Sequence, residues 1–182
     1  MEISSTAVKE LREKTGAGVM DCKKALQEAN GNLDRAMDIL REKGAMQLAK
    51  KLERAANQGI IDTYIHAGGR IGAMVELNCE TDFVARTEDF RKLAHDIAMQ
   101  VAAMSPKYVR PDEVADGESE AEHVLLKQPF IRDSKRTIEQ LIHEAVSKLG
   151  ENIQIRRFVR FEVGASLAGA TPEPDKNGAT AG

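Results

Sequence analysis

The stretch Asn78-Cys79-Glu80-Thr81-Asp82-Phe83-Val84-Ala85-Arg86 joins two segments of different periodicity, and the rest of the chain is organised around it. Residues 71–77 alternate apolar and other side chains, as a half-buried strand does, and residues 90–104 repeat apolar side chains at helical spacing. The stretch is therefore predicted to be a strand-to-helix turn. Thr81 suits the cap because its hydroxyl can bond a free backbone N–H, and Asp82 then falls in the first helical turn, where an anion is favoured.

Phe83 stands beside Asp82 in a chain of which only 4% is aromatic. One interpretation is that Phe83 fills the protein's own core while Asp82 merely caps the helix, and composition alone favours it. The other is that both side chains are displayed to a partner.

The stretch resembles the signature of the elongation factor Ts family, the bacterial guanine-nucleotide exchange factors for elongation factor Tu. A second signature of the family is matched by Thr15-Gly16-Ala17-Gly18-Val19-Met20-Asp21-Cys22-Lys23-Lys24-Ala25-Leu26. A third is matched by Gly150-Glu151-Asn152-Ile153, followed by Arg156-Arg157-Phe158. The three motifs stand in the family's order and span most of the 182 residues, so the resemblance is specific.

Composition indicates a soluble globular protein of one domain or two small ones, with 42% hydrophobic and 30% charged residues. The formal net charge of −3 gives no general attraction to nucleic acid. No apolar run approaches the roughly 18 residues of a membrane-spanning helix, and the N-terminus lacks the features of a signal peptide, so we expect a cytoplasmic protein. Cys22 and Cys79 are compatible with one disulfide, but reduced thiols are expected in the cytosol.

Residues 1–44 predict a three-helix domain. The first helix covers about residues 6–14 and ends at a glycine loop, the second covers about 19–29, and Asn32 caps a third that Gly44 stops. The glycine loop and the alanine and leucine stripes after it resemble ubiquitin-associated (UBA) domains. Residues 45–58 predict a linker helix whose basic side chains are interpreted as a solvated face.

Val19 and Met20 follow the glycine loop, and both cannot easily face so small a core. One interpretation is that one packs inside and the other is an isolated exposed apolar side chain, which is common. The other is a docking patch for a partner helix, as the resemblance implies. Periodicity alone leaves both open for Met20.

Residues 59–164 predict an α+β core domain of the dimerisation type. Strands at 60–66 and 70–78 form a hairpin around Ala67-Gly68-Gly69, and a helix covers about 90–104. A second helix, capped by Ser134 and stopped by Gly150, precedes a last strand at 153–163. We interpret these elements as an antiparallel three-stranded sheet with helices packed on one face.

Three further segments complete the core domain and the C-terminus. Residues 111–122 are acidic and turn-rich and predict an exposed, mobile connection, whereas 124–131 predict an extended apolar segment. Residues 165–182 predict a disordered tail. In the last strand, Phe158 falls on the outer side, either shielded or part of a contact surface. The opposite, core-facing side is expected to carry Ile153, Ile155, Val159, Phe161 and Val163.

Longer members of the family carry two related core halves and a helical-hairpin insertion, whereas this chain has one half and a short acidic connection. The resemblance therefore implies a short form, which would pair with a second copy to present both contact surfaces. Whether the outer side of the last strand meets the GTPase or that second copy is left open.

The residues for chemistry are few. His66, His95, His123 and His143 lie on separate elements without metal-ligand spacing, and Gly16-Ala17-Gly18 is too short to cradle a phosphate. We therefore expect no active site, metal, cofactor or small-molecule substrate.

The resemblance implies a different activity, nucleotide exchange on elongation factor Tu by binding alone. It implies that Thr81, Asp82, Phe83 and Val84 enter the GTPase beside its magnesium site. Phe83 would open the pocket as an apolar wedge, and Asp82 would perturb the groups that hold the metal. Val19 and Met20 would dock on the nucleotide-binding domain, while the sheet and the terminal strand, with Arg157 and Phe158, would contact the rest. GDP release would then allow GTP to rebind during translation elongation.

Three rival functions make different predictions. A ubiquitin-type adaptor would bind ubiquitin through residues 1–44. An RNA-binding protein near the ribosome would bind in a steeply salt-dependent way, which the acidic balance disfavours. An enzyme that uses Cys22 or Cys79 would be silenced by thiol alkylation.

Overall fold

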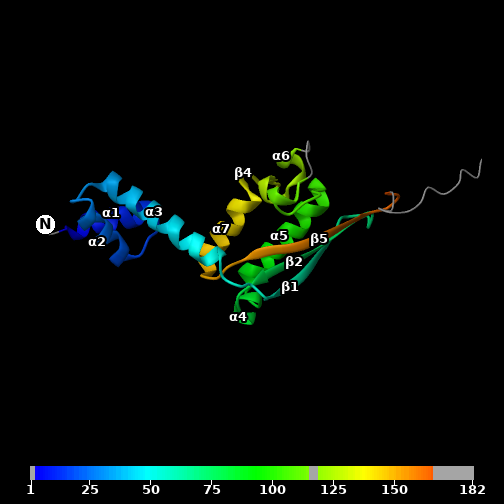
Figure 1. The fold of residues 1–182 in the computed structure, drawn as a ribbon, viewed down its shortest axis with the longest axis horizontal. Coiled ribbons are helices and arrows are strands. Elements are labelled where there is room, and N and C mark those ends of the chain that lie inside the picture. Colours follow the sequence, from blue (N-terminus) through cyan, green and yellow to red (C-terminus); the bar gives the residue numbers. More distant parts are fainter. Residues whose placement is uncertain (1–2, 115–118, 166–182) are drawn as a thin grey trace, which may run out of the picture. The chain divides into compact units, whose positions relative to one another are not determined.

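The computed structural model describes residues 3–114 and 119–165. Within them lie seven α-helices, a three-stranded antiparallel sheet in the order β1-β2-β5 and a two-stranded sheet, β3-β4 (Figure 1). The predicted α+β class is confirmed. Contacts divide the chain into unit 1 (Met1–Gly59, Asn78–Arg86, Gln140–Gln154) and unit 2 (Ile60–Leu77, Thr87–Glu139, Ile155–Gly182). The domain boundaries drawn from the sequence stay predictions.

Three N-terminal helices in unit 1 surround a small apolar core. Helix α1 (Ser5–Thr15) begins where Ala7 N–H donates to Ser4 Oγ at 3.2 Å and ends at Gly16, whose φ of +68° suits glycine. Helix α2 (Val19–Glu28) follows the glycine loop, and α3 (Leu33–Leu52) begins at the predicted cap, Asn32. The buried core comprises Leu11, Cys22, Ala25, Leu26, Ala29 and Ala36.

Helix α3 does not stop at Gly44, so that prediction is wrong. The helix runs through Gly44 to Leu52, and its last part occupies most of the predicted linker helix. Residues 45–52 are alanine, methionine, glutamine, leucine and lysine, which all favour helix. A single interior glycine costs only about 1 kcal/mol, which is too little to end a helix between good helix formers.

The sheet of unit 2 is built on the predicted hairpin. Strands β1 (Gln58–Ile65) and β2 (Ile71–Cys79) are joined where His66 N–H donates to Ile71 O at 2.9 Å, and β5 (Gln154–Glu162) pairs beside β2. The predicted alternation of a half-buried strand is confirmed in β2, because Ala73, Val75 and Leu77 are buried and the residues between them are not.

Helix α5 covers one face of this sheet. It spans Glu88–Met104, begins at the cap residue Thr87 and lies along the strands (Figure 1). Arg160 of β5 points to this side, because its Nε donates to Ala102 O at 3.0 Å. The helix therefore leaves the opposite face of β1, β2 and β5 without cover from α5.

The segment before the last helix differs from the prediction. Residues 124–131 contain a 3-10 turn (Leu125–Lys127) and a short strand, β3 (Pro129–Phe130), rather than one extended run. Strand β3 pairs with β4 (Asp133–Thr137), so Ser134 lies in a strand and α7 (Ile138–Leu149) begins four residues after it.

A buried glutamine of α5 explains this arrangement. Gln100 Nε2 donates to Pro129 O at 3.1 Å, and its Oε1 accepts from Ile131 N–H at 2.9 Å. This contact joins residues about 30 positions apart, so local sequence patterns do not reveal it.

The acidic connection contains a 3-10 turn (Pro111–Glu113) and helix α6 (Glu120–His123). Its residues 115–118 lie outside the described residues, and so does the predicted disordered tail from residue 166 onwards.

Candidate functional site

The signature turn, residues 78–86, forms a capped single turn of helix at the end of β2. Thr81 has extended φ and ψ of −125° and 156°, and its Oγ1 accepts from Val84 N–H at 3.4 Å. Helix α4 (Asp82–Ala85) follows, with Asp82 in its first turn. The predicted cap and the predicted position of Asp82 are both confirmed.

Phe83 lies on the outside of this turn. Its side chain is 77% exposed, the highest fraction among the large apolar residues of the described chain, while Ala85 of the same helix is buried. The interpretation that Phe83 fills the protein's own core is therefore wrong. An aromatic side chain displayed in this way is a candidate anchor for a partner.

Asp82 forms an ion pair across the same helical turn. Arg86 donates to its Oδ2 at 2.7 Å, and both side chains are substantially exposed. Pairs of this kind contribute little to stability in water, about 0.5 kcal/mol. The carboxylate of Asp82 is therefore accessible to a partner at little structural cost.

Glu151 binds the signature turn from 70 positions along the sequence. Its Oε2 accepts from Glu80 N–H at 3.1 Å and from Thr81 N–H at 3.0 Å, and its Oε1 accepts from Thr81 Oγ1 at 2.6 Å. Glu80 makes the return contact, because its Oε1 accepts from Asn152 N–H at 2.6 Å. We call these four residues, Glu80, Thr81, Glu151 and Asn152, the carboxylate clamp.

Asn152 ties the carboxylate clamp to the end of α3. It is fully buried, and its Nδ2 donates to Leu52 O at 3.2 Å and to Arg54 O at 2.6 Å. Asn78 adds a parallel contact from its Nδ2 to Ala56 O at 3.2 Å. Sequence reasoning found the Gly150–Ile153 motif but assigned it no role, and the only signal was a polar Glu-Asn pair directly after a helix-stopping glycine.

Cys79 lies under the turn as a buried, free thiol. Its Sγ donates to Thr81 O at 3.1 Å. Burial, and then the negative charge of Glu151, raise its pKa from 9.0 to about 11. The thiol therefore stays protonated near neutral pH, which fits a structural donor and not a nucleophile.

The predicted docking residues of the N-terminal domain are both exposed. Val19 and Met20 open α2 with 51% and 61% of their surface accessible, so the expectation that one of them packs inside is wrong. They belong to unit 1, as the signature turn does, but to a different element of it.

Arg157 and Phe158 lie in unit 2, on β5. Arg157 Nε donates to Glu76 Oε2 at 2.7 Å. Phe158 is half-buried and shares the side of Arg160, which α5 covers, so its predicted place on the outer side is wrong. The predicted core side of this strand is correct only at its start, where Ile153 and Ile155 are buried. Val159, Phe161 and Val163 are exposed, because α5 covers the side of Arg160 instead.

The sheet surface opposite α5 is strongly apolar. We call it the outer sheet face, and it comprises the exposed residues Ile61, Ile65, Met74, Val159, Phe161 and Val163. A shallow, mostly apolar depression of about 380 Å³ lies on it between Ile65, Met74 and Phe161. Monomeric proteins rarely leave a contiguous apolar patch of this kind uncovered.

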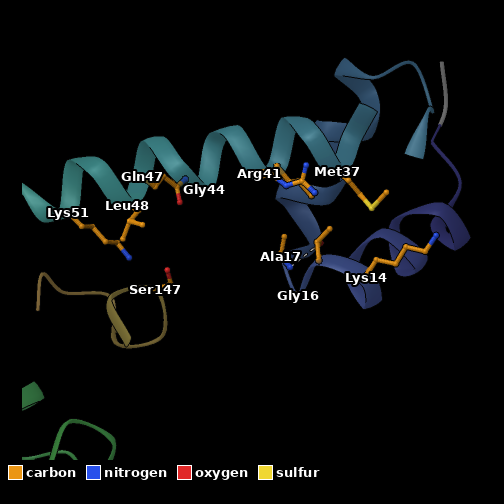
Figure 2. Close-up of a pocket in the computed structure, with 12 residues that line it drawn as sticks. Lys14, Gly16, Ala17, Met37, Arg41, Gly44, Gln47, Leu48, Lys51 and Ser147 are labelled. Carbon is orange, nitrogen blue, oxygen red and sulfur yellow. Dashed lines mark hydrogen bonds between the residues drawn. The ribbon is translucent and has the colours of Figure 1, made fainter. Parts of the chain in front are cut away.

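A groove of about 530 Å³ lies in unit 1 beside α3, between the glycine loop and Ser147 (Figure 2). Lys14, Arg41 and Lys51 line it, but each already has a partner in this chain. Lys14 pairs with Glu10 at 2.9 Å, Arg41 pairs with Asp38 at 3.0 Å, and Lys51 donates to Val146 O at 3.5 Å. Carboxylates thus offset the charges of Lys14 and Arg41, and the groove is a weak candidate for an anion site.

Residues 3–114 and 119–165 contain neither a cluster of metal ligands nor a membrane-spanning helix. No group of three or more histidine, cysteine or carboxylate side chains is placed to hold a metal ion there. In the same ranges, no helix combines the length and the apolarity that crossing a membrane requires.

Comparison with known proteins identifies one family. The family model described as elongation factor TS matches residues 2–123 and 117–165. Elongation factor Ts of Thermoanaerobacter sp. (strain X514) is 48% identical over 203 aligned positions, which cover 94% of this chain and 100% of the relative. The elongation factor Ts of Carboxydothermus hydrogenoformans is 49% identical over 198 positions that cover 91% of each chain.

A third relative, elongation factor Ts of Coprothermobacter proteolyticus, is 47% identical and is covered over its whole length. The chain thus spans at least nine tenths of each of these relatives. Both the family model and the relatives match most of the chain. The chain therefore belongs to the elongation factor Ts family.

Proposed function

We propose that this protein is a guanine-nucleotide exchange factor for elongation factor Tu that acts by binding, without covalent chemistry. Family membership supports the reaction and the partner. The observation that carries the proposal is the exposure of Phe83 on a capped turn, because a side chain that is 77% exposed is available to enter another protein. The activity belongs to translation elongation in the cytoplasm.

Exchange follows from differential affinity. A factor that binds the nucleotide-free GTPase more tightly than the nucleotide-bound one weakens nucleotide binding by the same factor. Much of a GTPase's affinity for GDP comes from contacts to phosphate and magnesium, so a local disturbance there speeds release. Phe83 inserts beside the magnesium site as an apolar wedge, and Asp82 presents a carboxylate that competes for the groups around the metal. Thr81 and Val84 flank the two side chains.

Docking surfaces bring the signature turn to its target. Val19 and Met20 supply an exposed apolar pair at the start of α2, which fits a helix of the nucleotide-binding domain. Arg157 and Phe158 on β5 contact a second part of the GTPase.

A second copy of the chain covers the outer sheet face in this proposal. The six exposed apolar residues of that face make a continuous surface on three paired strands, with no cover from α5. Pairing two such faces removes both from water, and it supplies a second core half to a short chain. A stable pair requires about 1,200–2,000 Å² of total buried surface.

The decisive experiment measures release of a fluorescent GDP analogue from elongation factor Tu with wild-type protein and with Phe83→Ala. We expect fast release by the wild type and a loss of at least about 30-fold in efficiency for Phe83→Ala, which corresponds to about 2 kcal/mol for a buried aromatic anchor. Met104→Ala is the matched control, because it removes another exposed apolar side chain from outside the proposed surfaces.

Two results would contradict the proposal. If the wild-type protein does not accelerate GDP release from elongation factor Tu at any concentration, it is not an exchange factor for this GTPase. If a folded Phe83→Ala variant is as active as Met104→Ala, the exchange reaction stands but the role of Phe83 does not.

A further inference from the structure

The signature turn has little of its own to hold it in place. Helix α4 contains four residues, far fewer than the roughly 12 at which an isolated helix becomes even marginally stable in water. Phe83 is 77% exposed, so packing cannot fix its direction. The position of its ring therefore depends on whatever anchors the cap residue, Thr81.

Every polar atom of Thr81 is bonded, and Glu151 makes two of those bonds. The N–H and the hydroxyl of Thr81 both donate to the Glu151 carboxylate, and the carbonyl of Thr81 accepts from Cys79 Sγ and from Ala85 N–H. A hydroxyl has one proton to donate. Because that proton goes to Glu151, the lone pairs of Oγ1 are left to accept from Val84 N–H, which is the bond that caps α4.

The carboxylate clamp also fixes Glu151 itself. Asn152 is joined by its N–H to Glu80 and by its side chain to the carbonyls of Leu52 and Arg54. The base of the turn is therefore held on both sides. These contacts all lie within unit 1.

We propose that Glu151 is a positioning residue for nucleotide exchange: by binding Glu80 N–H, Thr81 N–H and Thr81 Oγ1, it aims Phe83 at the GTPase before the two proteins meet. The inference rests on the proposed function, whose wedge it orients. A preorganised turn loses less conformational entropy on binding than a mobile one. More of the free energy of binding is then available to favour the nucleotide-free GTPase. The signature turn and the Gly150–Ile153 motif, which lie far apart in sequence, thereby form one structural unit.

Two conservative variants distinguish the effect of the length of the Glu151 side chain from the effect of its charge. Glu151→Gln keeps the length, and its amide can place Oε1 on the two backbone N–H groups while Nε2 donates to Thr81 Oγ1. Glu151→Asp keeps the charge but is one methylene shorter, so it cannot reach both sets of donors. A positioning role predicts that Gln retains most activity and that Asp loses about tenfold, the size of one charge-assisted hydrogen bond. The reverse order would overturn the proposal.

The kinetic form of the loss distinguishes positioning from general instability. With intact docking surfaces, Glu151→Asp lowers the maximal rate of GDP release and leaves the half-saturating concentration of the factor within about threefold. A partly unfolded variant would instead raise that concentration and keep the maximal rate, which would count against the proposal. In a Phe83→Ala background, Glu151→Asp causes no further loss, because the residue acts through Phe83. Additive losses would overturn it.

A spectroscopic readout tests this structural unit without the GTPase. The chain contains no tryptophan, so Phe83→Trp places a single indole reporter on the turn. We expect the nanosecond anisotropy of this indole to fall when Glu151→Asp is added and to stay unchanged when Glu151→Gln is added. Equal mobility of the reporter in all three proteins would overturn the inference. If the wild-type factor did not accelerate GDP release from elongation factor Tu, but the indole of the Phe83→Trp proteins responded as expected, the proposed function would fail. The positioning of the turn by Glu151 would still stand.

Discussion

Cys79 links the acid–base chemistry of one residue to the stability of the fold. Its pKa is raised to about 11 by burial and by the charge of Glu151, whereas an exposed thiol of the unfolded chain ionises near 9.0. Below pH 9 the thiol is neutral in both states, so its contribution to stability is complete. Between pH 9 and 11 the unfolded chain ionises first, and the free energy of unfolding falls by at most about 3 kcal/mol.

We therefore predict that Cys79→Ala removes this loss. The measurement is urea unfolding of wild type and variant from pH 7.5 to 11, with the difference between the two curves isolating Cys79 from other groups that titrate there. Cys22→Ala is the control, since it removes the other buried thiol and leaves Cys79 in place. Parallel pH curves for wild type and Cys79→Ala would contradict the assignment.

Asp82 gives a second prediction at this scale. Its partner Arg86 is exposed and the pair spans one turn, so Asp82→Asn changes the free energy of unfolding by less than about 1 kcal/mol. We expect it nevertheless to slow GDP release by about tenfold, because one charged contact near the metal is lost. Arg86→Gln removes the same ion pair and keeps the carboxylate, so it retains exchange. If both variants lose exchange equally, the ion pair is what counts.

Helix α3 runs through Gly44, where the sequence predicts its end, and substitutions of glycine test the reason for this difference directly. Gly44 lies in the helix interior, and a Cβ added there meets nothing within 4 Å. Gly44→Ala should therefore raise the free energy of unfolding by about 0.5–1 kcal/mol. Gly16→Ala should lower it, because Gly16 ends α1 with a φ of +68° that alanine adopts poorly. Thermal unfolding of both variants checks the pair, and opposite signs are required.

The elements that the sequence predicts correctly are those whose ends depend on neighbouring residues and not on distant ones. Caps are local, so neighbouring residues correctly predict Thr81, Asn32 and the glycine after α1 as helix ends. Strand β4 was missed because its stability comes from β3 and from buried Gln100 on another element. The face of β5 was assigned wrongly at Phe161, because alternation tells which side chains share a face but not which face a helix covers.

The candidate site divides in the same way. The signature turn, its cap and its acidic first turn could be predicted, because residues 78–86 themselves carry the signals for a cap and a helix start. The exposure of Phe83 could not, since an aromatic residue in a short turn fits a core as well as a surface. The part played by Glu151 was also beyond prediction, because its bonds connect motifs 70 positions apart.

For the whole molecule, the outer sheet face predicts self-association. Sedimentation equilibrium should show the wild type associating as its concentration rises, and Phe161→Glu should hold it as a monomer by placing a charge at the centre of that face. Met104→Glu adds the same charge at an exposed site elsewhere and should leave association unchanged. A wild type that remains monomeric at its highest soluble concentration would contradict pairing through the outer sheet face.

The division into two units has a consequence for how the protein is made. Unit 1 comprises three separate segments, and its last, Gln140–Gln154, carries Glu151 and Asn152. During synthesis the signature turn leaves the ribosome first and waits for the next 70 residues, roughly 4–14 s at 5–20 residues per second. Throughout that interval Thr81 lacks its acceptor, and Phe83 is carried on an unanchored strand end. A translation factor of this design thus acquires its working surface only after Glu151 and Asn152 have been synthesised.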